Sequence, residues 1–161
     1  MAVDMFLKLA DIKGECKDSA HKEEIDVESF SWGMTQSGSM HAGGGGGSGK
    51  VNVQDVSLTK YVDKASPNLM LACCNGTHYP EAVLAVRKAG EDPLEYLKIK
   101  MSEVMITSVQ TGGGGGEDRL TETLSLNFAK VEVEYQPQGK DGKADGGAIA
   151  MGWNIEENIK V

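Results

Sequence analysis

Apolar and polar residues alternate one by one along most of this chain, which is the period of a β-strand with one buried face. Near the start, Met5, Leu7 and Leu9 share one face and Lys8 lies on the other. The segment from Trp153 to Val161 repeats the alternation to the last residue and predicts one continuous final strand. We therefore expect a mainly β fold.

The alternation changes phase at three places, where the apolar residues move to the other face of the strand. At the first change, the apolar positions Ile25 and Val27 give way to Phe30 and Trp32. At the second, Val51 and Val53 give way to Val56 and Leu58. At the third, Leu124, Leu126 and Phe128 give way to Val131, Val133 and Tyr135. Because side chains alternate strictly along a strand, each change predicts a bulge, a sharp bend or a strand buried on both faces. Such strands are typical of a small bent β-barrel or sandwich.

One segment has the signals of a short α-helix instead. Ser66 is a candidate N-cap, Pro67 follows at the first helical position, and Gly76 lies just beyond the last helical residue. A helix of two to three turns is marginal alone, so it is expected to pack on the sheet. The fold class predicted for residues 1–161, taken as a single domain, is a mainly β bent barrel or sandwich with one short helix.

Three glycine-rich or polar connectors separate the strands, at residues 38–49, 112–116 and 136–147. Long connectors inside a compact domain are usually functional or disordered. Residues 44–50 nearly match the phosphate-binding pattern GxxxxGK[ST], but Val51 replaces the hydroxyl residue and a strand is expected to follow instead of a helix. The sequence therefore favours a linking loop over a nucleotide site.

The charge balance and the chain start exclude several classes of protein. The 161 residues carry a formal net charge of −8 without a basic cluster, which argues against nucleic-acid binding. No apolar run approaches the length of a membrane-spanning helix, so membrane insertion is not expected. The first residues lack the pattern of a secretory signal. We expect the protein to be made in the cytoplasm and, if it leaves, to be carried by another machine.

The sequence contains no pattern that predicts catalysis, a metal or a cofactor. His21, His41 and His78 lie in different connectors and are expected at the surface. Neighbouring residues along a strand point to opposite faces, so acidic residues that are adjacent in sequence predict no catalytic carboxylate pair. These adjacent pairs are Glu23–Glu24, Glu117–Asp118 and Glu156–Glu157. The chain is therefore not expected to be an enzyme.

The cysteines and the large aromatic residues each leave an alternative open. Cys16, Cys73 and Cys74 are expected to be buried or half-buried free thiols, although Cys73 and Cys74 could form a disulfide between neighbours. The aromatic residues are expected in the core, or with one or two of them at a subunit interface. They are Phe30, Trp32, Tyr135 and Trp153.

Many segments together resemble the haemolysin-coregulated protein (Hcp) family of bacterial type VI secretion. No single segment is specific, but they follow one another nearly from end to end in the family's order. They are Met1–Phe6, Glu24–Val27, Ser31–Met34, Gln36–His41, Gly49–Asp55, Thr59–Tyr61, Ser66–Met70, His78–Pro80, Arg87–Gly90, Gly115–Glu122, Leu126–Ala129, Tyr135–Gln138 and Gly152–Ile155.

This resemblance implies a tube subunit. Family members form hexameric rings that stack into a hollow tube inside a contractile sheath, below a trimeric spike, and bind effector proteins in the ring lumen. It also implies export by the type VI apparatus without a signal peptide, and a role in virulence. Physical reasoning agrees in part, because closing a ring of subunits covers the edge strands that a lone subunit leaves open.

The resemblance also implies two groups of site residues. Ser31 matches a serine that faces the lumen in the family and touches effectors. The glycine-rich connector is expected to be the loop that joins one ring to the next. Its predicted contact residues are Ser39, Met40, His41, Gly44, Gly45, Gly46, Ser48 and Lys50.

Two other functions are compatible with the sequence. The first is a ligand-binding β-barrel that does not polymerise. The second is a small hydrolase or nucleotide-dependent enzyme, which the altered loop at residues 44–50 alone supports. A measurement of size in solution separates the tube subunit from the first alternative, and a nucleotide-binding measurement tests the second.

Overall fold

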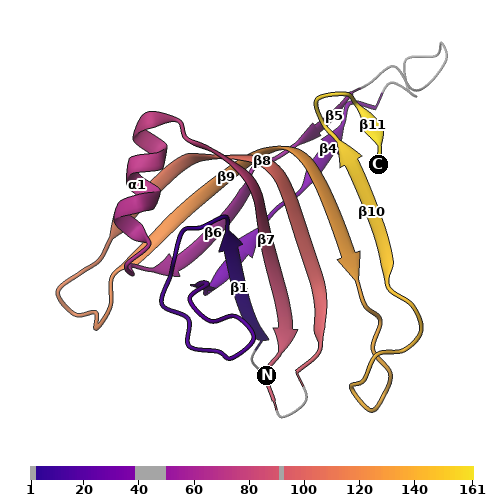
Figure 1. Ribbon diagram of the computed structural model, residues 1–161, viewed down its shortest axis with the longest axis horizontal. Coiled ribbons are helices and arrows are strands. Elements are labelled where there is room, and N and C mark those ends of the chain that lie inside the picture. Colours follow the sequence, from indigo (N-terminus) through magenta and orange to yellow (C-terminus); the bar gives the residue numbers. More distant parts are fainter. Residues whose placement is uncertain (1–2, 39–49, 91–92) are drawn as a thin grey trace.

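Figure 1 shows the computed structural model, which describes residues 3–38, 50–90 and 93–161. These residues form eleven strands and one helix. In chain order they are β1 (Val3–Leu9), β2 (Ile25–Val27), β3 (Ser29–Ser31), β4 (Met34–Gln36), β5 (Val51–Val53), β6 (Val56–Tyr61), α1 (Ser66–Asn75), β7 (His78–Lys88), β8 (Glu95–Gly112), β9 (Thr121–Tyr135), β10 (Ile149–Asn154) and β11 (Ile159–Lys160).

The strands close into a bent barrel, as the sequence predicts. Antiparallel pairing runs from β2 through β1, β7, β8, β9 and β6 to β3. Only Glu28 separates β2 from β3, so this single segment of chain joins the two ends of the pairing order. The long strands β8 and β9 bend across the molecule (Figure 1). Two smaller parts stand outside the circuit, the hairpin of β4 and β5 and the extension of β9 by β10 and β11.

All three changes of phase mark an exchange of strand partners. At Glu28 the chain stops pairing with β1 and begins to pair with β6. Between Val53 and Val56 it leaves the β4–β5 hairpin and enters the barrel. Strand β9 is continuous, but one of its edges pairs with β6 up to Leu126 and with β10 from Lys130 onward. A strand that changes partners also changes the face that is buried, which is the physical reason for each slip.

The interior of the barrel is filled by apolar side chains from nearly every strand. Leu7, Leu84, Leu124 and Leu126 are fully buried, and Leu69 of α1 joins the same cluster. Phe30, Trp32 and Trp153 pack against this cluster while remaining partly accessible. Tyr135 is 45% exposed, so the prediction that it lies in the core is wrong.

The helix is present, but Ser66 does not cap it. Ala65 occupies the N-cap position, and no side chain makes a capping hydrogen bond there. Ser66 is instead the first residue of α1, and its hydroxyl points into the barrel. Gly76 ends the helix in the left-handed conformation with φ of 70°, as the sequence predicts. No helix in the described ranges is long and apolar enough to span a membrane.

The prediction of one continuous final strand is wrong. Residues 155–158 form a turn, in which Asn158 has φ of 57° and the Asn154 side chain accepts a hydrogen bond from the Glu157 amide at 2.9 Å. Strand β11 therefore folds back on β10, pairing Trp153 with Lys160. Alternation of residue types continues through the turn, so the period alone could not reveal it.

Candidate assembly and cargo surface

Two rows of small polar side chains cross four neighbouring strands of the barrel. The strand register places Ser31 of β3, Ser57 of β6, Ser125 of β9 and Ser108 of β8 side by side. The adjacent row contains Ser29, Thr59, Thr123 and Gln110 on the same four strands. Residues directly opposite on antiparallel strands share a face of the sheet, so these eight side chains form one surface, which we call the hydroxyl face.

The hydroxyl face points away from the core. Its residues alternate with the buried Leu58 in β6 and Leu124 in β9, and with Phe30 in β3 and Val109 in β8, which are partly buried against the core. Ser29, Ser31 and Gln110 are exposed, and the other five residues are partly exposed. The Ser108 and Ser125 hydroxyls are 3.1 Å apart and hydrogen-bonded. The surface carries no formal charge, although the chain has a net charge of −8.

Among the described strands, none pairs with either edge of this four-stranded surface. Strand β3 pairs with β6 and with no other described strand. On the opposite side, β7 pairs with β8 only as far as Met105, and residues 106–112 of β8 pair with β9 alone among the described strands. Free strand edges expose unpaired N–H and C=O groups, which readily pair with another chain.

The predicted site residues are placed as follows. Ser31 is exposed at one edge of the hydroxyl face, and Lys50 is exposed directly before β5. A strand follows Lys50, which agrees with the interpretation of residues 44–50 as a linking loop. The remaining predicted loop residues, Ser39, Met40, His41, Gly44, Gly45, Gly46 and Ser48, lie outside the described residues.

The sequence reasoning missed a fully buried ion pair inside the barrel, beneath the N-terminus of α1. The Lys60 ammonium donates to Glu122 Oε2 at 2.5 Å, to Asp63 Oδ1 at 3.1 Å and to Ser66 Oγ at 3.2 Å. The Ser66 hydroxyl donates to the same Glu122 oxygen at 2.8 Å, and Thr111 donates to the other at 3.1 Å. Buried charges are tolerated where they are paired and hydrogen-bonded in this way.

A sequence signal for this pair existed. Lys60 continues the inward positions Val56 and Leu58 of β6, and Glu122 precedes the inward positions Leu124 and Leu126 of β9. Opposite charges in the apolar register of two strands predict that they meet if the strands are neighbours, and here they are directly opposite. Ser66 links the pair to α1, so the network holds the helix on the barrel.

The loop between β1 and β2 is held to the barrel by a second polar cluster. His21 is buried, so its predicted surface position is wrong. Its Nδ1 lies 2.9 Å from Glu24 Oε1, its Nε2 contacts Glu95 Oε1, and its ring stacks on Phe6 at 4.0 Å. Arg87 of β7 pairs with Asp18 of the same loop, and its hydrogen bonds lower the pKa of the Asp18 carboxyl.

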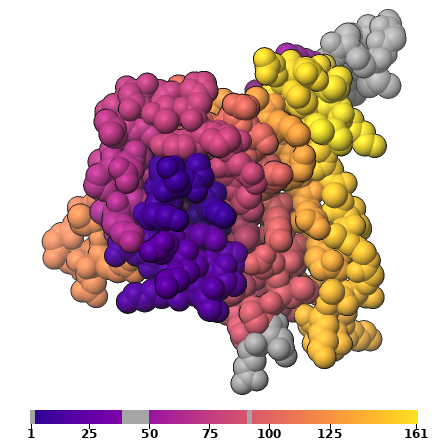
Figure 2. Space-filling model, viewed as in Figure 1, coloured from indigo at the N-terminus to yellow at the C-terminus, as the bar shows by residue number. Residues whose placement is uncertain are grey.

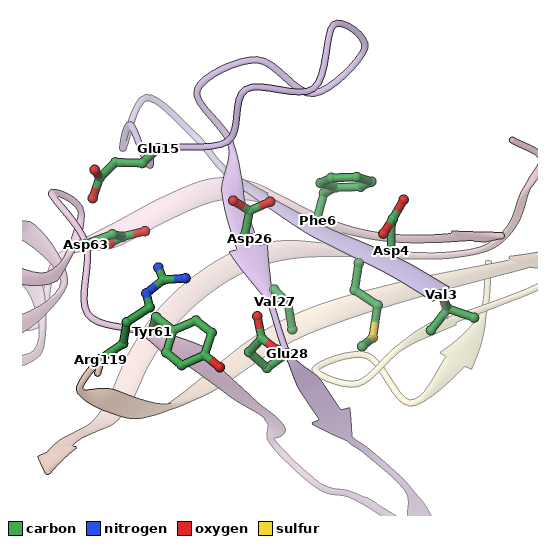
Figure 3. A pocket seen from close by; sticks show the side chains of 11 residues that line it. Val3, Asp4, Phe6, Glu15, Asp26, Val27, Glu28, Tyr61, Asp63 and Arg119 are labelled. Carbon is green, nitrogen blue, oxygen red and sulfur yellow. The ribbon is translucent and has the colours of Figure 1, made fainter. Parts of the chain in front are cut away.

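A hollow of about 290 Å³ beside this loop has five carboxylates and one guanidinium in its lining. Figure 3 shows the Arg119 guanidinium on the side of the hollow where Glu15 and Asp63 lie. Arg119 stacks over the Tyr61 ring at 3.9 Å. The acidic residues that line the hollow are Asp4, Glu15, Asp26, Glu28 and Asp63. Their charge disfavours phosphate or other anions, and no group of three metal-ligating side chains is found among the described residues.

The three cysteines are free thiols, as predicted, but the prediction that all of them are buried or half-buried is wrong for Cys74. Cys74 is exposed on α1, Cys73 is half-buried, and Cys16 is buried in the β1–β2 loop. Burial, together with a hydrogen bond to the Asp26 carboxylate, raises the pKa of the Cys16 thiol to about 11. The thiolate is the reactive form of cysteine, so Cys16 is expected to be inert.

Thiol labelling tests this difference. With a pKa of about 11, only about one Cys16 thiol in 1,000 is ionised at about pH 8. We expect iodoacetamide to modify Cys74 first and to leave Cys16 unmodified in the folded protein, as followed by intact-mass and peptide mass spectrometry. Denatured protein, in which all three thiols should react, is the control. Equal rates at Cys16 and Cys74 before unfolding would contradict the assignment.

Comparison with known proteins places the chain in a family. The family model described as "Type VI secretion system effector, Hcp" matches residues 6–135. Protein hcp1 of Pseudomonas aeruginosa is 64% identical over 161 residues, which cover 99% of each chain. Two solved structures are also similar. Hcp1 from Salmonella typhimurium is 40% identical, with a TM-score of 0.84 and coverage of 100% of both chains. A type six secretion system protein is 34% identical, with a TM-score of 0.93 and coverage of 99% of this chain and 100% of the other.

The fold, the order of the matching segments and these similarities agree over nearly the whole chain. The bent barrel with one short helix, first expected from the phase changes and the residues around Pro67, is the fold of these relatives as well. The chain belongs to the Hcp family of type VI secretion proteins.

Proposed function

We propose that this chain is the tube subunit of a type VI secretion system, closing into hexameric rings that stack into a hollow tube. The observation that carries the proposal is the pair of free edges on the four-stranded hydroxyl face. The surface has four antiparallel strands, so its two edge strands, β3 and β8, run in opposite directions. When all copies have the same orientation, β3 of one copy can therefore pair antiparallel with β8 of the next. Head-to-tail pairing of this kind closes into a ring when its rotation permits.

The same arrangement gives the lumen its chemistry. Joining the edges would line the inside of the ring with the hydroxyl faces of all copies. Ser31 is exposed at such an edge and would contact effector proteins from each junction between subunits. The barrel interior is filled by side chains such as Leu58 and Leu126, which supports a role for the outer surface over binding of a ligand inside the barrel.

The resemblance to the family supports a wider assembly as well. Lys50 and the connector before it would bridge stacked rings, and the contractile sheath and trimeric spike would surround and cap the tube. Export would occur through the apparatus itself, without catalysis by this chain.

Ring formation is tested by mass in solution and by negative-stain electron microscopy. We expect multi-angle light scattering to give about six times the chain mass of 17.1 kDa, and images to show rings with a central hole. A chain that stays monomeric at micromolar concentration would overturn the proposal and favour a barrel that does not polymerise.

Effector binding is tested by placing charge in the lumen. We expect Ser31→Lys to leave rings intact and to reduce the recovery of type VI effectors with rings purified from the source cells at least about tenfold, because each ring would then carry lysines where it had neutral hydroxyls. Ser19→Lys, in an exposed loop, is the matched control and should retain them. Equal recovery with both variants would exclude Ser31 as a contact residue.

A further inference from the structure

The apolar inner rows of the barrel sheet continue beyond the barrel onto β9 and β10. One row runs across five strands through Leu7, Leu84, Ile99, Val133 and Met151. Leu7, Leu84 and Ile99 are buried, whereas Met151 is 42% exposed. The next row ends in the same way, with Tyr135 and Ile149 being 45% and 66% exposed. The core face of the sheet is therefore left uncovered at this end.

The uncovered end forms a groove together with the β4–β5 hairpin. The groove has a volume of about 240 Å³ and a mainly apolar lining of Met34, Gln36, Val51, Val53, Val131, Met151, Trp153 and Asn158. The Trp153 Nε1–H is buried here and has no hydrogen-bond partner among the described residues. A buried donor without an acceptor costs about 1–3 kcal/mol, so a partner that supplies an acceptor would be favoured.

The outer side of α1 carries a second apolar surface without a partner among the described residues. Its inward positions Leu69 and Ala72 lie in the core. The outward positions, at the i, i+3, i+4 and i+7 spacing of one helix face, are Pro67, Met70, Leu71 and Cys74. Met70 is 38% exposed and Leu71 is 60% exposed. We call this surface the α1 stripe.

The groove and the α1 stripe lie on opposite sides of the molecule. Figure 1 places α1 at the left and β4, β5, β10 and β11 at the upper right, and Figure 2 shows the same separation on the molecular surface. Each surface is close to one free edge of the hydroxyl face. Met34 of the groove follows Ser31 of the β3 edge by three residues, and α1 packs on β8, with Gly76 beside Met105 where β7 leaves β8.

We propose that the α1 stripe of one copy of this chain seats in the groove of the next copy. The reason is geometric: a neighbour whose β8 edge meets β3 also presents its α1 on the side where the groove opens. The two apolar surfaces cover each other, and the neighbouring chain can supply an acceptor for Trp153 Nε1. This inference rests on the proposed ring and assigns the second contact between its subunits.

Disulfide trapping tests this contact with a thiol that the chain already carries. In a Cys73→Ser background, the variant Met151→Cys is oxidised with copper phenanthroline, and Cys74 provides the second thiol. We expect a ladder of covalent oligomers extending beyond the dimer on non-reducing gels, because a head-to-tail contact links each copy to two neighbours. Adding Cys74→Ser should abolish the ladder. Lys8→Cys, on an exposed position of β1, is the control for random cross-linking.

Charge substitution gives an independent measurement. We expect Leu71→Glu to raise the protein concentration needed for assembly about tenfold or more, because a contacting apolar side chain is replaced by a carboxylate. Leu120→Glu is the matched control, since Leu120 is also exposed at 49% but lies in the β8–β9 connection, outside both surfaces.

The outcomes separate this inference from the proposed function. If light scattering shows rings but Met151→Cys gives no cross-linked oligomers, the α1 contact is overturned and the proposal of a tube subunit stands. Cross-linking that stops at the dimer would also overturn it, because a two-fold contact closes on itself. A monomeric chain would overturn both.

Discussion

Replacing Glu122 by alanine is expected to lower the free energy of unfolding by about 3 kcal/mol, because it removes the nearer of the two carboxylates that pair with the buried Lys60 ammonium and leaves only Asp63, at 3.1 Å. Both side chains of this pair are 0% exposed, so water cannot replace the lost carboxylate. The Ser66 hydroxyl loses the oxygen that it donates to, and the start of α1 loses its attachment to β9. Urea unfolding at fixed protein concentration, followed by Trp fluorescence, measures the change.

Two controls identify burial as the cause. Glu132→Ala removes an exposed partner of Lys130, whose ion pair spans 3.5 Å, and should cost less than about 1 kcal/mol. The double variant Lys60→Met with Glu122→Leu removes both charges and should recover most of the loss. A cost for Glu122→Ala no larger than that for Glu132→Ala would show that the buried network contributes little.

Gly14→Ala is expected to destabilise the protein by about 1–3 kcal/mol, because the new methyl group has no room. A Cβ at this position would lie 2.5 Å from the Glu24 carbonyl oxygen and 2.9 Å from Ile25 Cα. Both are backbone atoms, and the Gly14 N–H also donates to the Glu23 carbonyl at 2.8 Å, so the loop must shift as a whole. The midpoint of urea unfolding reports the effect.

Gly33→Ala is the matched control for this substitution. The nearest atom to its Cβ would be the Gln54 side-chain oxygen at 3.7 Å, an ordinary contact, so the change should stay within about 0.5 kcal/mol. If both alanine variants unfold at the same urea concentration, close packing of the β1–β2 loop does not limit stability.

The alternation of residue types predicted where strands change partners, but not which partners they take. The change of phase at Glu28 can be recognised in the sequence, because Ile25 and Val27 occupy one face of the strand and Phe30 occupies the other. The pairing of β3 with β6 depends on segments almost thirty residues apart, and nothing local to either segment encodes that distance. For the same reason, Ser31 was found through family resemblance, whereas its row with Ser57, Ser108 and Ser125 required the register.

The helix and the last strand show where local signals fail. The Ser66 hydroxyl suits an N-cap, but Lys60 and Glu122 offer it stronger, charged hydrogen-bond partners inside the barrel. The turn at residues 155–158 interrupts an alternating pattern that predicts a strand. For Ser66 the local preference was outweighed by contacts with residues distant in the sequence, whereas the turn is made by local contacts that the alternation of residue types does not reveal.

The sequence by itself determined that this chain is mainly β with one short helix, and its ordered motifs identified the Hcp family. Periodicity and capping signals act over a few residues, so they survive without knowledge of the fold. Only the tertiary structure decided that Lys60 meets Glu122 and that eight small polar residues form the hydroxyl face. It also decided that two strand edges and two apolar surfaces are left uncovered by the residues that the structure describes. These features arise from pairing between distant strands, which fixes neighbours that no local pattern specifies.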